Sequence, residues 1–296
     1  MLPQKAIEAL NTPLNLHGEG PIWHSGRQSA FWVDILSDTI FEFCWNKNHV
    51  NTYPNAKFVS AIFEIESQND SLICSVKGGL GIYYLYDKEC RIFNDLGIDW
   101  QERRGNDGAI DPLGNIWFST THIDHLDGDG NLYCLLPDGE IKKMVERVSI
   151  SNGPSWSPDG KTMFHTDSGS RSIKRYFQNQ WQLTETIRPI HIAEDFGYPD
   201  GMAMDVNGIL WVAIWGGFAV GGYDIKTSRL VHKITVPVPH VSSCAFVGSN
   251  LDYLLITTSR KGLSQEDLLK YPESGRTFLV QMDTKGVQMR AFSKKF

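Results

Sequence analysis

The sequence predicts an all-β fold, a six-bladed β-propeller, and three observations support this prediction. Helical periodicity is nearly absent, and short runs rich in Val, Ile, Phe, Trp and Tyr alternate with Gly, Asp, Asn and Pro. Six segments share one order of elements, namely a turn, an apolar strand, a polar or glycine-rich link and usually a strand with Tyr or Phe. These segments also recur at a nearly constant spacing, which a tandem of unrelated domains would not be expected to keep.

The repeat covers most of the chain. The first apolar residues of the six core strands are Phe31, Leu72, Ile116, Met163, Leu210 and Leu254. They lie 41, 44, 47, 47 and 44 residues apart, and a period of about 40 to 50 residues with four strands per unit is typical of propeller blades. Six such units account for roughly 268 of the 296 residues. We therefore expect residues 1–296 to form a single β-propeller domain.

Both ends of the chain and one insertion fit this arrangement. An open ring would leave two unpaired sheet edges, so we expect "IEALNTPLNLHG" to add a strand to the blade completed by "RTFLVQMDTKGVQMRAF". The insertion "GLSQEDLLKYPESG" has Ser264 followed three residues later by Asp267, which is typical of a helix start. Pro272 and Gly275 mark its end. The insertion is therefore predicted to form a short surface helix.

Composition excludes several classes of partner. The chain has 28 basic and 34 acidic residues, a formal charge of -6 and no long Lys/Arg-rich run, which argues against binding to nucleic acid or to an anionic membrane. It shows no apolar stretch typical of a signal peptide or a membrane span. Its five cysteines lack a CxxC spacing and are expected to be buried free thiols. We therefore expect a cytoplasmic protein; the sequence does not indicate its oligomeric state.

An oxygen-bearing residue precedes each core strand at a matched position, 10 to 12 residues before the first apolar residue. These residues are Glu19, Ser60, Asn106 together with Asp107, Asn152, Asp200 and Ser243. The innermost strands of a propeller line a central channel, so equivalent positions of the blades lie on a ring around its axis. Four blades place Glu, Asn or Asp followed by a small residue there, and the glycines allow close approach of the backbone. Glu19 and Asp200 are thus expected to face each other.

Carboxylates and amides that converge in a channel would repel one another and lose their hydration unless a cation joined them. Oxygen ligands without Cys or His suit Ca²⁺, Mg²⁺ or Mn²⁺, with Zn²⁺ and Fe²⁺ as alternatives. The opposing interpretation is that Asn-Gly, Asp-Gly and Glu-Gly are ordinary turn dipeptides. Their recurrence in phase with the repeat favours a site for a divalent metal ion.

In this order, several segments resemble the signature segments of the senescence marker protein/gluconolactonase/regucalcin-like family. They are "HGEGPIW", "RRGNDGAIDPLGNIWFST", "SNGPSWSPDGKTMFHTDS", "YPDGMAMDVNGILWVA", "SSCAFVG" and "TTSRKGLSQEDLLKYPESG". The resemblance spans roughly Glu19 to Leu279 and implies a six-bladed propeller that acts as a metal-dependent lactonase on sugar-acid lactones. At the matching positions it implies that Glu19, Asn152 and Asp200 bind one divalent metal ion, with Ca²⁺ expected first.

The resemblance also implies a substrate site. Arg104 and Asn106 would hold the sugar hydroxyls or the carbonyl, with Asn106 alternatively serving as a further metal ligand. Asp124 is the nearest match to an acidic residue that contacts substrate in many relatives. Asp200 is our preferred general base, because a carboxylate next to the metal can reach a bound water. Trp215 is expected in the blade core or at the channel mouth, where it could stack on a sugar face.

Two other functions stay open at this point. A metal-centred propeller could act as an esterase or phosphotriesterase, although the polar pair Arg104 and Asn106 favours a hydroxylated substrate. It could also be a regulatory protein that binds a divalent metal ion and catalyses no reaction. A Ser-His-Asp mechanism is not expected, since the sequence has no GxSxG motif.

Overall fold

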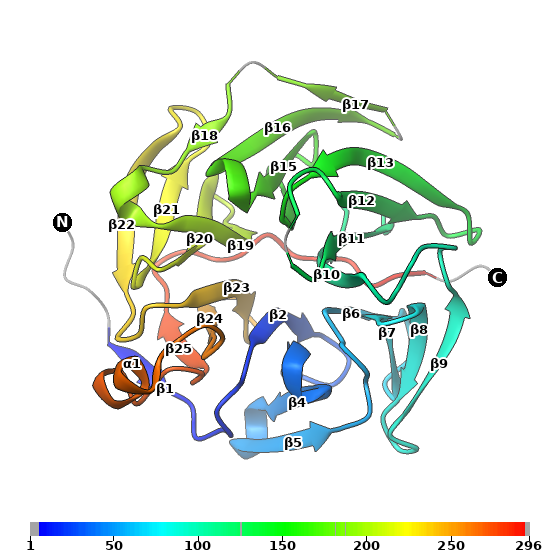
Figure 1. The fold of residues 1–296 in the computed structure, drawn as a ribbon, viewed down its shortest axis with the longest axis horizontal. Coiled ribbons are helices and arrows are strands. Elements are labelled where there is room, and N and C mark those ends of the chain that lie inside the picture. The colour runs from blue at the N-terminus through cyan, green and yellow to red at the C-terminus, as the bar shows by residue number, and fades with distance from the viewer. Residues whose placement is uncertain (1–5, 125, 181, 187, 294–296) are drawn as a thin grey trace.

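Six antiparallel sheets surround a central axis, so the predicted six-bladed β-propeller is confirmed (Figure 1). The computed structural model describes residues 6–124, 126–180, 182–186 and 188–293. The first five and last three residues of the predicted 1–296 domain lie outside this range. None of the helices in the described part of the chain is long and apolar enough to cross a membrane.

The blades follow one another along the chain. Blade 1 comprises β2 (Gly18–His24), β3 (Ser29–Asp34), β4 (Thr39–Cys44) and β5 (His49–Tyr53). Blade 2 comprises β6 (Ala61–Glu64), β7 (Ser71–Val76), β8 (Gly79–Tyr84) and β9 (Glu89–Asn94). Blade 3 comprises β10 (Arg103–Ile110), β11 (Ile116–His122), β12 (Gly130–Leu135) and β13 (Ile141–Val148).

The second half of the ring repeats this order. Blade 4 comprises β14 (Ser151–Trp156), β15 (Thr162–Asp167), β16 (Ser172–Asn179), β17 (Gln182–Glu185) and the short β18 (Ile190–His191). Blade 5 comprises β19 (Tyr198–Met204), β20 (Ile209–Trp215), β21 (Ala219–Asp224) and β22 (Arg229–Thr235). Blade 6 comprises β23 (Val241–Val247), β24 (Tyr253–Thr258), β25 (Phe278–Gln281) and β1 (Ile7–Ala9). Short 3-10 helices are η1 (Ile35–Ser37), η2 (Trp45–Lys47), η3 (Ser168–Ser170) and η4 (Glu194–Phe196).

Blade 6 joins the two ends of the chain. Its sheet order is β1-β25-β24-β23, and β1 pairs with β25 in the register Ile7↔Val280. The antiparallel ladder gives the edge of β25 a partner, so that the outer edge of this sheet is the short strand β1. In the insertion that precedes β25, α1 (Gln265–Lys270) forms where the sequence predicts a helix. Ser264 caps it, and the Ser264–Asp267 capping box is present.

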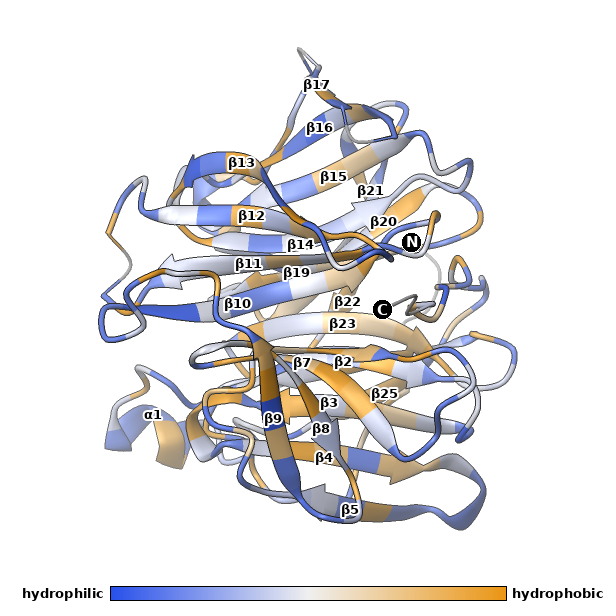
Figure 2. Ribbon diagram, turned by 90° about the vertical axis from the view of Figure 1, so that its right-hand side faces the viewer, coloured by the Kyte–Doolittle hydropathy of each residue, from blue (hydrophilic) through white to orange (hydrophobic). Residues whose placement is uncertain are grey.

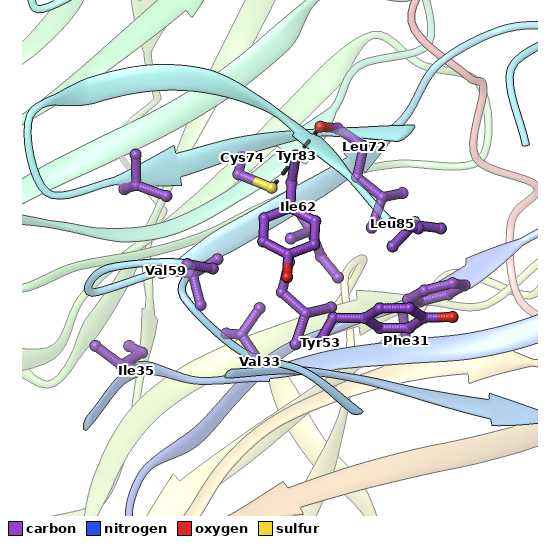
Figure 3. Packing of buried hydrophobic residues seen from close by; sticks show 13 residues of the cluster. Phe31, Val33, Ile35, Tyr53, Val59, Ile62, Leu72, Cys74, Tyr83 and Leu85 are labelled. Carbon is purple, nitrogen blue, oxygen red and sulfur yellow. Dashed lines mark hydrogen bonds between the residues drawn. The ribbon is translucent and has the colours of Figure 1, made fainter. Parts of the chain in front are cut away.

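Apolar side chains fill the spaces between adjacent blades. Between blades 1 and 2, Phe31 and Val33 pack against Leu72 and Tyr83 (Figure 3). All four side chains are fully buried. Figure 2 shows apolar residues concentrated in the strands, with polar residues in many of the connecting loops. Similar clusters occur at the other blade interfaces, so the ring is held together by contacts between blades, and its inner strands are fixed relative to one another.

The chain after β25 crosses the ends of the inner strands opposite the starts that carry Glu19 and Asp200 (Figure 1). Val287 N donates to Met204 O (3.0 Å) at the end of β19. Phe292 N donates to Glu64 O (2.8 Å) at the end of β6. The Phe292 side chain is fully buried in the cluster between blades 2 and 3. The segment therefore anchors three blades at this end of the channel.

Phe292→Ala is expected to lower the free energy of unfolding by about 3–5 kcal/mol, because it removes a fully buried aromatic side chain and leaves a cavity. Urea titration followed by tryptophan fluorescence measures the change. Met289→Ala is the matched control, since Met289 lies in the same segment with half of its surface exposed. Equal effects of the two substitutions would show that Phe292 does not anchor the segment.

Candidate metal and substrate site

Shifts in the pairing register of the inner strands orient the side chains of the site. The pairing register shifts between Glu19 and Ile22 in β2, and between Asn152 and Ser155 in β14. Similar shifts occur in β10, β19 and β23. A bulge bends a strand and redirects its side chains. Gly20 (φ +52°) and Gly153 (φ +71°) supply the left-handed backbone conformation directly after Glu19 and Asn152, which explains the glycine at these two positions.

The structure brings Glu19, Asn152 and Asp200 together at one end of the channel. They come from blades 1, 4 and 5 and line a cavity of about 500 Å³. Each is at most 7% exposed. Arg104 and Asn106, from blade 3, line the same cavity. These residues, which the sequence places on a ring, therefore line the same cavity. Ser60 and Ser243, at the equivalent positions of the two remaining blades, are buried next to Gly105 and Gly201.

The two carboxylates are held in an unfavourable electrostatic environment. Burial, followed by the charges of Asp200 and Asp107, raises the pKa of Glu19 well above its ordinary value. Burial and the charge of Asp107 likewise raise the pKa of Asp200, and Arg104 offsets only part of this effect. Ionised carboxylates without compensation are costly in a site of this kind. The cost would be relieved by a cation bound between them.

A chain of hydrogen bonds sets the orientation of the amides. Arg104 Nη1 donates to Asn106 Oδ1 (2.6 Å), and Asn106 Nδ2 donates to Asn152 Oδ1 (2.7 Å). Asn152 Nδ2 in turn donates to Ser168 Oγ (2.9 Å). The amide oxygen of Asn152 keeps a second lone pair for a cation. The oxygen of Asn106 accepts from Arg104, so the structure couples Asn106 most directly to the predicted substrate-binding arginine.

Asp107 accepts backbone hydrogen bonds that its place in the repeat does not predict. Its carboxylate accepts hydrogen bonds from Gly108 N (2.7 Å) and, across the blade boundary, from Gly153 N (2.8 Å). Burial raises the pKa of Asp107 to about 6. It therefore fixes the backbone next to Asn152 and adds negative charge beneath Glu19 and Asp200.

Further aromatic and basic residues line the cavity. The Trp215 ring stacks on His240 with a centroid separation of 4.1 Å and meets the His17 ring edge-on at 5.7 Å. Trp215 thus lies at the cavity, as the sequence allows. Lys261 also lines it. His17, His240 and Lys261 are not predicted by the repeat, because they lie in loops outside the repeated position. Their only signal is the adjacency of His17 to "GEG" and of Lys261 to the insertion.

Asp124 lies apart from these residues. It follows β11, its side chain is exposed, and its backbone N donates to His122 Nδ1 (3.0 Å). It is not among the residues that line the cavity. Contact between Asp124 and a substrate stays a prediction.

The donor set fits a hard divalent ion. Within the described residues there is no cluster of three His, Cys, Asp or Glu side chains that could hold a metal ion, so the candidate set is two carboxylates with the amide oxygen of Asn152. An all-oxygen set with open positions suits Ca²⁺, Mg²⁺ or Mn²⁺ better than a soft metal ion. A cation bound between Glu19 and Asp200 would oppose the burial and the repulsion that raise their pKa values.

Residues 17–260 match the model of the SMP-30/Gluconolactonase/LRE-like region. The chain belongs to this family. It is 31% identical to the putative sugar lactone lactonase YvrE of Bacillus subtilis, over 93% of this chain and 94% of that protein. Among solved structures, it resembles the calcium-binding protein regucalcin from Agrobacterium tumefaciens, with a TM-score of 0.89, 25% identity and 97% of each chain covered. A luciferin-regenerating enzyme gives a TM-score of 0.88 at 27% identity, covering 99% of this chain and all of that one.

Proposed function

We propose that this protein hydrolyses a sugar-acid lactone to the free acid with the help of one divalent metal ion. The observation that carries the proposal is the convergence of two buried carboxylates, Glu19 and Asp200, with the amide of Asn152 in a cavity that Arg104 also lines. The similarity to a putative sugar lactone lactonase agrees with it. The similarity to a calcium-binding protein makes Ca²⁺ the first ion to test.

Each residue of the site has its own role in the proposed hydrolysis. Glu19, Asn152 and Asp200 would hold the ion, which supplies Lewis acidity toward the lactone carbonyl and lowers the pKa of water. Arg104 presents a fork of donors suited to carbonyl and hydroxyl oxygens, and Asn106 fixes the orientation of its guanidinium. Asp200 accepts a proton from the attacking water. The ring C–O bond then breaks, and the proton passes to the departing oxygen, which becomes the hydroxyl group of the product acid.

The test is hydrolysis of a panel of aldonolactones by protein stripped of metal and then supplied with Ca²⁺, Mg²⁺, Mn²⁺, Zn²⁺ or Fe²⁺ in turn. Acid release is followed with a pH indicator, and a phenyl ester and a phosphotriester are included. The proposal expects lactone cleavage that depends on an added ion. Preferential cleavage of either other ester would point to an esterase or phosphotriesterase. Binding of an ion without any hydrolysis would point to a regulatory metal-binding protein.

Arg104→Lys is expected to lower kcat/KM for the lactone by about ten- to a hundredfold, mainly through KM, because lysine keeps the charge but loses the fork of donors. Steady-state kinetics measures the effect. Arg103→Lys is the matched control, since the neighbouring Arg103 side chain forms an ion pair with Asp129 (2.6 Å) and does not line the cavity. Unchanged kinetics in Arg104→Lys would remove Arg104 from the substrate site.

A further inference from the structure

Two basic side chains reach the cavity from opposite sides of the ring. Arg104 belongs to β10 of blade 3, and Lys261 follows β24 of blade 6. Blades 3 and 6 lie opposite each other in the ring (Figure 1). Both residues line the cavity, together with Glu19 and Asp200. A ligand in the cavity is therefore within reach of a positive charge on each side.

The backbone around Lys261 is tied firmly to the first blade. The buried hydroxyl of Ser259 accepts a hydrogen bond from Lys261 N (3.0 Å) and pairs with His17 Nδ1 (3.0 Å). Arg260 N donates to Leu16 O (3.0 Å). The bonds from Ser259 to His17 and from Arg260 to Leu16 join segments that are more than 240 residues apart in the sequence. The backbone of Lys261 is thus held in place at the cavity.

The charges of the cavity point to the kind of ligand it accepts. Burial, followed by the charge of Arg104, lowers the pKa of Lys261 to about 8. Without an ion, the charges of Arg104 and Lys261 are outnumbered by those of the carboxylates Glu19, Asp107 and Asp200. In the proposed function a divalent ion makes the summed charge at the cavity positive. A cavity with this excess attracts anions.

We propose that Lys261 determines substrate specificity by binding a second acidic group, so that the preferred substrate is a sugar lactone with a carboxylate or phosphate at the end remote from the lactone carbonyl. The inference rests on the proposed lactonase function and narrows its substrate class. Arg104 and Asn106 hold the lactone end, and Lys261 holds the acidic end on the opposite side. A cavity of about 500 Å³ lies within the usual range for small-molecule sites.

The first test is calorimetric binding of three acids that differ at carbon 6, namely D-gluconate, D-glucarate and 6-phospho-D-gluconate. Each is titrated into metal-free protein and into protein with Ca²⁺ just above the protein concentration. We expect D-glucarate or 6-phospho-D-gluconate to bind about ten- to a hundredfold more tightly than D-gluconate, as for a hydrogen bond to a charged group. Whichever of these two acids binds more tightly shows whether the site prefers a carboxylate or a phosphate. Equal affinities for all three acids would overturn the proposal.

Lys261→Met is expected to abolish this preference, and Lys261→Arg to retain most of it. Lys226→Met is the matched control: it removes the same charge from an exposed turn of blade 5 and should leave the preference unchanged. Persistence of the preference in Lys261→Met would show that another residue binds the acidic group, and it would overturn the proposal. Circular dichroism verifies that each variant is folded.

The second test compares hydrolysis of D-glucaro-1,4-lactone with that of D-glucono-1,4-lactone. We expect the ratio of kcat/KM to favour the acidic lactone, mainly through KM, and to fall toward one in Lys261→Met. A ratio of one in the wild-type protein would overturn the proposal. If neither lactone is hydrolysed but binding of the acids still depends on Lys261, the lactonase function fails while anion recognition by Lys261 stands.

Discussion

Asp200→Ala is expected to lower kcat/KM for lactone hydrolysis about a thousandfold or more and to leave the propeller folded. The substitution removes the proposed general base, which typically contributes 10²–10⁴-fold, and also one of two carboxylates available to the ion. Asp200 lies at the cavity rather than between blades, so its loss opens no gap in the apolar clusters. Asp200→Asn, which keeps the shape but not the charge, is expected to behave similarly.

The experiment combines kinetics with calorimetric titration of Ca²⁺. Both Asp200 variants should lose Ca²⁺ affinity together with activity, while far-ultraviolet circular dichroism stays that of the wild type. Glu194→Ala is the matched control, because it removes an exposed carboxylate from the segment that leads into the same blade. Full activity in a folded Asp200→Ala protein would exclude Asp200 from catalysis, and unchanged Ca²⁺ affinity would exclude it from the metal site.

Glu19→Gln is expected to be more stable than the wild type at pH 8 in the absence of metal, by roughly 1–3 kcal/mol, and nearly equal to it at pH 4. The pKa of Glu19 is raised in the folded state by burial and by Asp200 and Asp107. The unfolded carboxylate therefore loses its proton more readily than the folded one. The cost of ionising Glu19 is absent below its unfolded pKa and grows as the pH rises toward its folded pKa.

The measurement is the difference in free energy of unfolding between wild type and Glu19→Gln, in chelator, across this pH range. Buried histidines such as His165, whose pKa burial lowers to about 3, change stability in the opposite direction. They affect both proteins equally and cancel in the difference. Addition of Ca²⁺ should reverse the order, because the wild type alone keeps both carboxylates for the ion. A difference that does not vary with pH would show that Glu19 bears no such charge cost.

Much of the fold was predictable because its signals are local. A turn, a strand and a link are each encoded within a few residues, and six copies at a spacing of about 45 residues specify the number of blades. The helix at Ser264 was predictable for the same reason, since its capping box involves only Ser264 and Asp267. The ring position of Glu19, Asn152 and Asp200 followed from the same repeat, because equivalent positions of a closed ring face one axis.

The rest of the site depends on contacts that no repeat encodes. The hydrogen bond from Gly153 N to Asp107 joins neighbouring blades, and its partner could be identified only once the blades were packed. Trp215 was ambiguous in the sequence, since an aromatic residue at the end of a strand suits both a blade core and a channel mouth. Its stacking on His240 places it at the cavity.

The sequence by itself determined the all-β class, the number of blades and the ring of oxygen-bearing residues in phase with the repeat, because each depends on short-range patterning multiplied sixfold. Only the tertiary structure decided which residues share the cavity with them. Lys261 reaches it from a loop outside the repeat, held by Ser259 and His17 across 242 residues of chain. Such a contact exists only after the ring has closed, because closure brings the first and last blades together.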